Sequence, residues 1–147
     1  MISVSKIART FLLPFFLVTG VLLGASYAAR PDTTTAGGFI INNGANANFG
    51  LNARNPAAPS GHVNFVDHAS GLHFRSTDIT AYIIVDADTR QIEGTGVLDD
   101  GTTVTFVVVV TDAGEPGTSD TFSITLSNGF SASGTLVGGN VQIHPAN

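Results

Sequence analysis

Three histidines, His62, His68 and His73, lie close together in the middle of the chain, with Asp67 between them. Imidazole can bind a metal ion or act as a general base at neutral pH, and a carboxylate can orient it. This segment is therefore the first candidate for chemistry. It would suit a zinc site, or a small secreted hydrolase or ligand-binding enzyme that uses His62, Asp67, His68 and His73.

The spacing of these histidines argues against a shared zinc ion. If residues 68–71 form a four-residue turn, Phe65 pairs with Phe74 and His73 stands opposite Val66. His62 then lies four residues further along its strand, about 13 Å away at ~3.3 Å per residue, which is too far for one zinc ion. We expect His62 and His73 to point outward, and His144 to approach them only through the wider fold.

The segment from Asp112 to Asp120 holds three carboxylates, Asp112, Glu115 and Asp120, with two glycines and a proline among them. Calcium takes six to eight oxygen ligands, and these side chains with nearby carbonyls and hydroxyls could supply them. The sequence therefore predicts a candidate calcium site at this loop, although the spacing matches no EF-hand. The alternative is a long hairpin loop whose aspartates accept hydrogen bonds from turn amides.

Other catalytic patterns are missing from the sequence. It has no cysteine nucleophile and no Gly-x-Ser-x-Gly elbow between a strand and a helix. The acidic residues fall at predicted strand ends and turns, whereas glycosidases need two carboxylates that face each other across a cleft. We therefore expect a protein that is not an enzyme and has no catalytic residue.

The first 28 residues resemble a secretory signal peptide. Lys6 and Arg9 precede an apolar stretch over residues 11–24, and a small-x-small site ends at Ala28. An apolar run of about 14 residues is shorter than the ~20 that a membrane-spanning helix needs, so cleavage is favoured over a retained anchor. We expect a secreted or extracytoplasmic protein, in the periplasm, on the cell surface or outside the cell.

The charge of the remaining chain limits its partners. After the leader, four arginines stand against eleven acidic residues, which gives a net charge of −7. Such a chain is a poor partner for nucleic acid. A protein or glycan partner stays open, and contact with a membrane is expected only through an uncleaved leader.

The positions that could do chemistry must be held by β-strands, because short apolar runs alternate with turn residues about every 8–12 residues. We predict an all-β fold, an antiparallel β-sandwich or a barrel-like meander of about 8–10 short strands. Residues 29–37 are expected to be flexible and residues 38–147 to form one domain. Residues 55–60, which contain two prolines, should cross between sheets or edges. The expected strands span residues 39–41, 47–54, 62–67, 72–75, 79–86, 90–98, 102–111, 121–126, 130–136 and 140–144.

Two turns fix the register of the second half. A three-residue loop at residues 127–129 places Phe122 opposite Gly134, and one at residues 99–101 places Phe106 opposite Gly94. Large side chains then face glycines on one side of each hairpin. Threonine and serine occupy the other side, which we expect to be solvated.

Several stretches resemble the post-COAP domain, a bacterial module of secreted or surface proteins. They are residues 61–68 (GHVNFVDH), 70–73 (SGLH), 92–96 (IEGTG), 111–126, which contain the run GEPGTSDTFSI, and 128–144. The resemblance implies an extracytoplasmic β-domain with no established activity, and it transfers no catalytic residue. Together with the leader it predicts an exported, non-catalytic β-domain with a structural or interaction role, for which calcium is the candidate ion.

Overall fold

The computed structural model describes residues 30–55 and 58–146, and in this part of the chain every regular element is a β-strand. The predicted all-β class is therefore confirmed. The leader expected at residues 1–28 lies outside the described residues. The strands are β1 (Asp32–Asn42), β2 (Ala45–Asn55), β3 (Ser60–Asp67), β4 (Leu72–Ile84), β5 (Thr89–Leu98), β6 (Thr103–Thr111), β7 (Thr121–Leu126), β8 (Ser131–Thr135) and β9 (Gly138–His144).

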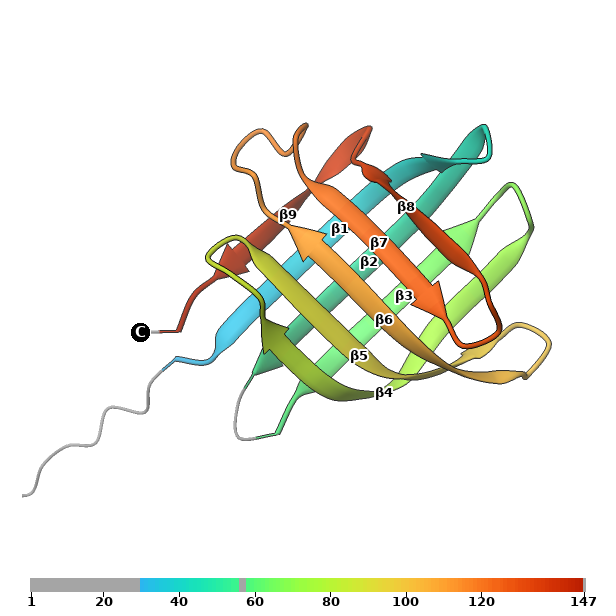
Figure 1. Cartoon of the computed structure of the whole chain (residues 1–147), viewed down its shortest axis with the longest axis horizontal. Helices are drawn as coiled ribbons and strands as arrows, with labels where there is room; N and C mark the ends of the chain where they lie inside the picture. The colour runs from blue at the N-terminus through green and yellow to red at the C-terminus, as the bar shows by residue number, and fades with distance from the viewer. Residues whose placement is uncertain (1–29, 56–57, 147) are drawn as a thin grey trace, which may run out of the picture.

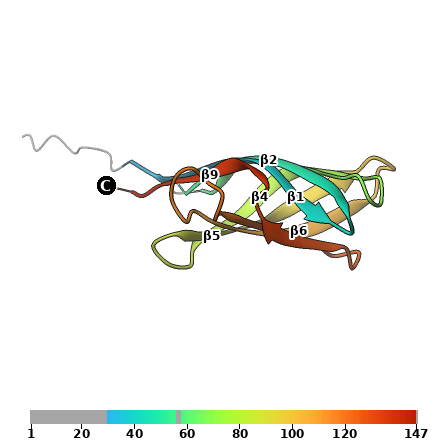
Figure 2. The ribbon, with the colours of Figure 1, turned by 90° about the horizontal axis from the view of Figure 1, so that it is seen from above.

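All nine strands belong to one curled antiparallel sheet (Figure 1), in the order β8-β7-β6-β5-β4-β3-β2-β1-β9. The first eight strands form a meander, and β9 then returns to pair with β1. The sheet curls so that β9, β1, β2 and β3 form one half and β5 to β8 the other (Figure 2). The two halves face each other and enclose the core.

Strand β4 belongs to both halves because it changes partners along its length. It pairs with β3 only through residues 72–75, but with β5 along almost its whole length, with register shifts after Ser76 and Ile79. Where the ladder between β3 and β4 ends, the amide of Val63 donates to the hydroxyl of Ser76 at 2.8 Å. This side-chain hydrogen bond replaces a ladder bond at the point where the sheet opens.

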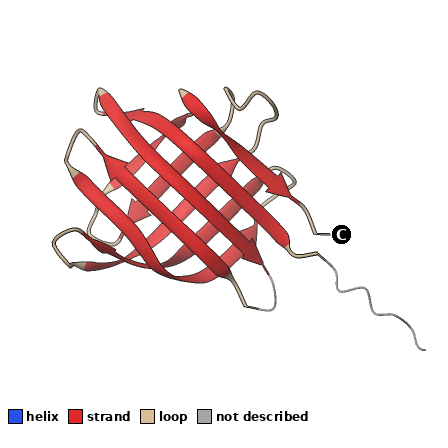
Figure 3. Cartoon of the chain, turned by 180° about the vertical axis from the view of Figure 1, so that it is seen from behind, coloured by secondary structure: helices blue, strands red, loops and turns tan. Residues whose placement is uncertain are grey.

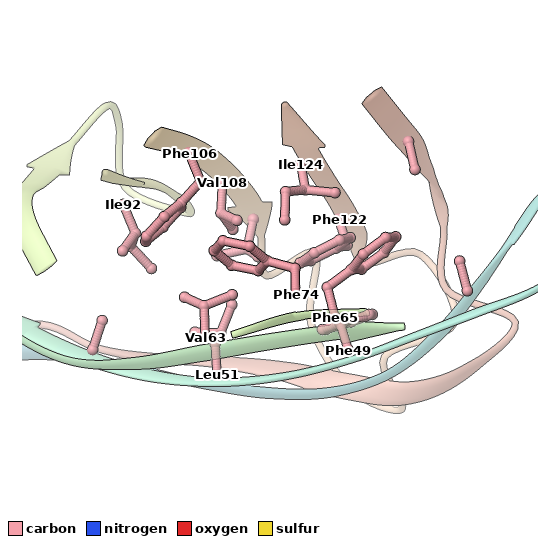
Figure 4. Close-up of a cluster of buried hydrophobic side chains, with 14 of the residues drawn as sticks. Phe49, Leu51, Val63, Phe65, Phe74, Ile92, Phe106, Val108, Phe122 and Ile124 are labelled. Carbon is pink, nitrogen blue, oxygen red and sulfur yellow. The ribbon is translucent and has the colours of Figure 1, made fainter. Parts of the chain in front are cut away.

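The core is filled by side chains that alternate with exposed ones along each strand, as the period of two requires. Phe122 of β7 stacks on Phe49 of β2, with ring centroids 4.0 Å apart, and lies 5.8 Å from Phe65 of β3 (Figure 4). Phe74 meets Phe106 edge-on at 5.2 Å. These aromatic contacts join the two halves of the sheet across its interior.

The predicted hairpin registers are confirmed. Phe106 lies opposite Gly94, and Phe122 lies opposite Gly134. A Cβ on Gly94 would collide with the backbone oxygen of Asp78 and lie 2.8 Å from the ring of Phe106. Glycine at this position therefore allows both the backbone of β4 at Asp78 and the Phe106 ring to approach β5 closely.

Three expectations about local structure were wrong. Residues 29–37 were expected to be flexible, but β1 begins at Asp32 within them. This strand is ordered because it has hydrogen-bonded partners on both sides. Its threonines and glycines resemble a loop only when they are considered alone. The expected strands 72–75 and 79–86 form the single strand β4. The strands on either side of residues 55–60 pair with each other, so this segment joins neighbours and does not cross the sheet.

Candidate binding face

The three central histidines are exposed and do not meet. The pairing of His73 with Val66 is confirmed, and His62 lies opposite Asn52 of β2. His68 Nε2 is 3.1 Å from the side-chain oxygen of Asn48. Among residues 30–55 and 58–146, no group of three or more His, Cys, Asp or Glu side chains could hold a metal ion.

Asp67 is fully buried and caps the turn after β3. Its carboxylate accepts hydrogen bonds from the backbone amide of Ser70 and the side-chain amide of Asn42, each at 3.0 Å, and from the hydroxyl of Ser70. Burial raises the pKa of Asp67, but these hydrogen bonds outweigh burial and hold the pKa below its ordinary value. The arrangement separates Asp67 from the exposed histidines.

The three carboxylates of the acidic loop all face β9. The carboxylate of Asp120, which is fully buried, accepts the amides of Ala113 at 2.8 Å and Val141 at 2.7 Å. Asp112 accepts the amide of Ile143 at 3.0 Å. Two backbone amides of β9 are thus bound by side chains of the loop, which protects this edge strand from pairing with another chain.

Glu115 extends the same contact to the outward side chains of β9. One of its oxygens accepts the amide groups of Asn140 at 2.9 Å and Gln142 at 3.2 Å. The structure therefore gives all three predicted calcium ligands a role as hydrogen-bond acceptors. Whether they also bind calcium stays a prediction.

A larger candidate site lies on the outer side of β9, β1, β2, β3 and the start of β4. This layer faces the viewer in Figure 3, which is turned by 180° from Figure 1. We call this surface the amide face, because asparagine and glutamine are its most frequent polar side chains. Side chains on it alternate with buried ones. Its residues are Thr33, Thr35, Gly37, Phe39, Ile41, Asn46, Asn48, Gly50, Asn52, Arg54, His62, Asn64, Val66, His73, Arg75, Gly138, Asn140, Gln142 and His144.

The pairing of five neighbouring strands builds a trough across the amide face. Asn140, Gly37, Gly50, Asn64 and Arg75 stand directly opposite one another in succession. Two glycines therefore lie side by side in the middle of the row, with an asparagine on either side and an arginine at one end. A Cβ on Gly50 would meet nothing within 4 Å, so the space above it is open.

A hollow of about 490 Å³ lies along one side of this row. Phe39, Asn48 and Val66 border it, and Asn64 and Gly50 line it next to the trough. The ring of Phe39 covers Gly138, where a Cβ would lie 2.7 Å from the ring. The hollow thus combines an aromatic ring, two amide side chains and exposed backbone.

The two outer faces of the sheet differ in charge. The amide face carries Arg54, Arg75 and three of the chain's four histidines at outward strand positions. No outward position on this face holds a carboxylate. The outer side of β5 to β8 carries threonine and serine rows, as predicted, with Glu93 among them. Asp32 and Asp67 lie in these strands but are buried, so the outward positions of the amide face carry no acidic side chain.

Sequence reasoning missed this face because its rows depend on the pairing of strands that are distant in the chain. One local signal was available. Asn46, Asn48 and Asn52 alternate along β2 with buried Ala47, Phe49 and Leu51. Such alternation of amides with apolar residues indicates that one side of the strand presents amides to solvent.

Comparison with protein-family models, with curated proteins and with solved structures finds no match for this chain. Among residues 30–55 and 58–146, no helix has the length and hydropathy needed to cross a membrane.

Proposed function

We propose that this chain is an exported, non-catalytic β-domain that acts as an interaction module in the cell envelope or the extracellular space. The amide face is the surface through which it binds its partner. The leader pattern of residues 1–28 and the resemblance to the post-COAP domain support export. The filled aromatic core supports a binding role on the outer surface, because the hollows we find are open and lie outside the core.

The difference between the two outer faces is the observation that carries this proposal. A solvated sheet face has no need for glycines at the centre of a row, since glycine weakens a strand interior. Gly37 and Gly50 lie opposite each other on the amide face, and neither has its Cβ space filled by a packed side chain. Such glycines are typical of a place where another molecule approaches the backbone closely.

Export is tested by expressing the full chain with a C-terminal tag in a bacterium and weighing the product by mass spectrometry. We expect a product that begins at Ala29 outside the cytoplasm, because residues 1–28 have the features of a cleaved leader. Leu17→Arg, which interrupts the apolar stretch, should leave the protein uncleaved in the cytoplasm. A wild-type protein that keeps its full mass in the cytoplasm contradicts the proposal.

A hydrolase that uses the histidine segment is the alternative. One contact favours it, since His73 Nδ1 lies 3.1 Å from Asp99 Oδ2 beside a hollow that Asn64 and Arg75 also line. A carboxylate that orients an imidazole is part of many hydrolytic sites. In this alternative the exported protein cleaves a chromogenic ester, and His73→Gln removes the cleavage without changing the melting temperature.

Calcium binding at Asp112, Glu115 and Asp120 remains part of the proposal, and because these carboxylates are not grouped as a metal site in the structure, binding would have to draw them together. An ion that binds only the folded protein stabilises it by about 2.7 kcal/mol at one hundred times its dissociation constant, which is several degrees in melting temperature. We expect a rise of this size in millimolar calcium and its loss with chelator. Glu115→Gln keeps the amide acceptor but removes a charge, so it should reduce the rise. An unchanged melting temperature leaves the three carboxylates as acceptors of protein amides only.

A further inference from the structure

We propose that the amide face binds an acidic polysaccharide, a chain of sugars of which some carry a carboxylate, with a sugar ring seated over the glycine trough. This inference rests on the proposed function, because it names the class of partner. Three features of the face support it: the shape of the trough, its uncharged polar groups, and its charge.

The shape suits a flat ring. Gly37 and Gly50 leave the backbone exposed at the centre of the row, and Phe39 borders the hollow beside it. Neighbouring strands lie about 4.8 Å apart, so the row from Asn140 to Arg75 spans four intervals, or roughly 19 Å. The two glycines can seat one sugar ring, and a row of this length can contact further rings of the same chain through the side chains that flank the glycines.

The polar groups suit hydroxyls. An asparagine side chain has both a donor and an acceptor, and it can therefore bind two adjacent hydroxyls of a sugar. Asn64 and Asn52 make no side-chain hydrogen bond with the described residues, and the side-chain oxygen of Asn140 is buried without a partner among them. Asn48 is held in place by His68. Asn64 and Asn52 are thus available to a ligand, whereas Asn140 is held by Glu115 and has its oxygen buried.

The charge suits a carboxylate. Arg75 ends the row and Arg54 lies on the same face, and neither forms a salt bridge with the described residues. Arginine binds carboxylates through two parallel hydrogen bonds. Two acidic groups border the face: Asp99 is paired with His73, and Glu115 is bound to Asn140 and Gln142. The two arginines are therefore free to bind carboxylates of a ligand, and their charges balance those of the two acidic groups at the border of the face.

A nucleic acid fits these features less well. A duplex carries a negative charge every ~1.7 Å along its axis, and it would be repelled by a chain that holds eleven acidic residues. An acidic polysaccharide carries fewer charges per unit length, and the two arginines can each bind one of its carboxylates.

The test measures binding of the exported protein to polygalacturonate and to alginate by affinity electrophoresis and titration calorimetry. Methyl-esterified polygalacturonate has the same backbone without the charge, and polyglutamate has the charge without the sugar. We expect binding to at least one of the two acidic polysaccharides that is at least tenfold tighter than binding to either control and that weakens with salt.

Variants place the binding on the face. Gly50→Leu fills the open space above the trough and should reduce affinity at least tenfold, while its melting temperature stays close to that of the wild type. Arg75→Gln should weaken binding to the charged polymer to about the level of the methyl ester. Thr125→Leu is the matched control, because Thr125 is exposed on the opposite face in β7. It should bind like the wild type.

The outcomes distinguish the role of charge, the class of partner and the location of binding. Equal binding of the esterified polymer overturns the role of charge, and equal binding of polyglutamate shows an acidic peptide to be the partner. Binding that Gly50→Leu leaves intact overturns the placement on the amide face. If an exported protein binds neither polysaccharide, this inference is wrong while the proposed export and interaction role still stand. A protein that is not exported overturns the proposed function itself.

Discussion

The substitution Arg90→Ala is expected to lower the free energy of unfolding by about 3–5 kcal/mol, because it leaves a buried carboxylate without its partner. Arg90 is 2% exposed and Asp32 is 3% exposed. Two parallel hydrogen bonds join them, from Nε to Oδ1 and from Nη2 to Oδ2, each 2.9 Å long. Asp32 begins β1 and Arg90 lies in β5, so this pair ties the two halves of the sheet together.

The neighbouring groups complete the pair. The hydroxyl of Tyr82 donates to Asp32 and also contacts the hydroxyl of Thr34 at 2.6 Å. Arg90 donates further to the backbone oxygens of Asp86 at 2.8 Å and Thr89 at 2.9 Å. Every charged atom of the pair therefore has a hydrogen-bond partner. Removing either side chain leaves the polar groups that bonded to it without a partner in the core.

Chemical denaturation of Arg90→Ala and Asp32→Asn measures this loss. Arg54→Ala is the control, since Arg54 is exposed and only its Nε bonds the Ser60 hydroxyl, at 2.9 Å; it should change stability by less than about 0.5 kcal/mol. The double variant Asp32→Leu with Arg90→Met should cost less than either single change. A loss below about 1 kcal/mol in Arg90→Ala contradicts the assigned role of the pair.

The same network makes stability depend on pH at both extremes. Burial raises the pKa of Asp32, but the hydrogen bonds from Arg90 and Tyr82 outweigh it and hold this pKa below its ordinary value of 3.8. Its contribution to stability is therefore present above the pKa of the unfolded chain and is lost as the pH falls through the lower, folded value. Asp32→Asn should remove this part of the acid transition.

At alkaline pH, Tyr82 determines whether stability rises or falls with pH. Burial, and then the hydrogen bond to Asp32, raise the pKa of Tyr82 from 10.0 to about 12. Stability from Tyr82 is complete below pH 10 and is lost as the pH rises towards 12, because the unfolded chain releases the proton first. Tyr82→Phe should flatten the denaturation profile over this range.

The hairpins of the second half could be predicted from the sequence because their pairing is local. Three-residue loops ending in Gly101 and Gly129 fix which residues face each other, and both glycines have positive φ, at 85° and 92°. The pairs of Phe106 with Gly94 and of Phe122 with Gly134 follow directly. The turn at residues 68–71 gave the register of the histidine segment in the same way.

The remaining features depend on contacts between distant residues. Asp32 and Arg90 are 58 positions apart, and nothing near either residue signals that the other will be its partner. The pairing of β1 with β9 is equally distant, and it alone brings Asn140 beside Gly37. Alternation along one strand shows which residues share a side, but only the order of the strands shows which rows they form. The trough and the buried pair were for this reason beyond sequence reasoning.

The contact between the two halves of the sheet is tested most directly at Phe122. Phe122 is 1% exposed, and its ring lies nearly parallel to that of Phe49, at 11°, and to that of Phe65, at 13°. β7 has no backbone pairing with β2 or β3, so side chains alone join them here. Its neighbour on β8 is Gly134, which has no side chain that could fill a cavity.

We therefore expect Phe122→Ala to lower the free energy of unfolding by about 4–5 kcal/mol, near the upper end for a truncated phenylalanine, because Gly134 beside it has no side chain that could fill the cavity. The melting temperature should fall by roughly 10–20 °C. Phe130→Ala is the matched control. Phe130 is only half-buried and meets Phe65 at 5.8 Å with tilted rings, so its truncation should cost clearly less.

Equal losses in the two variants would show that the stack adds nothing beyond ordinary burial. A small loss of unfolding free energy in Phe122→Ala would indicate that the Asp32 and Arg90 pair, and not the aromatic stack, holds the two halves of the sheet together. The row of the amide face is set by backbone pairing among β9, β1, β2, β3 and β4, so the Phe122 contact supports that layer from its inner side.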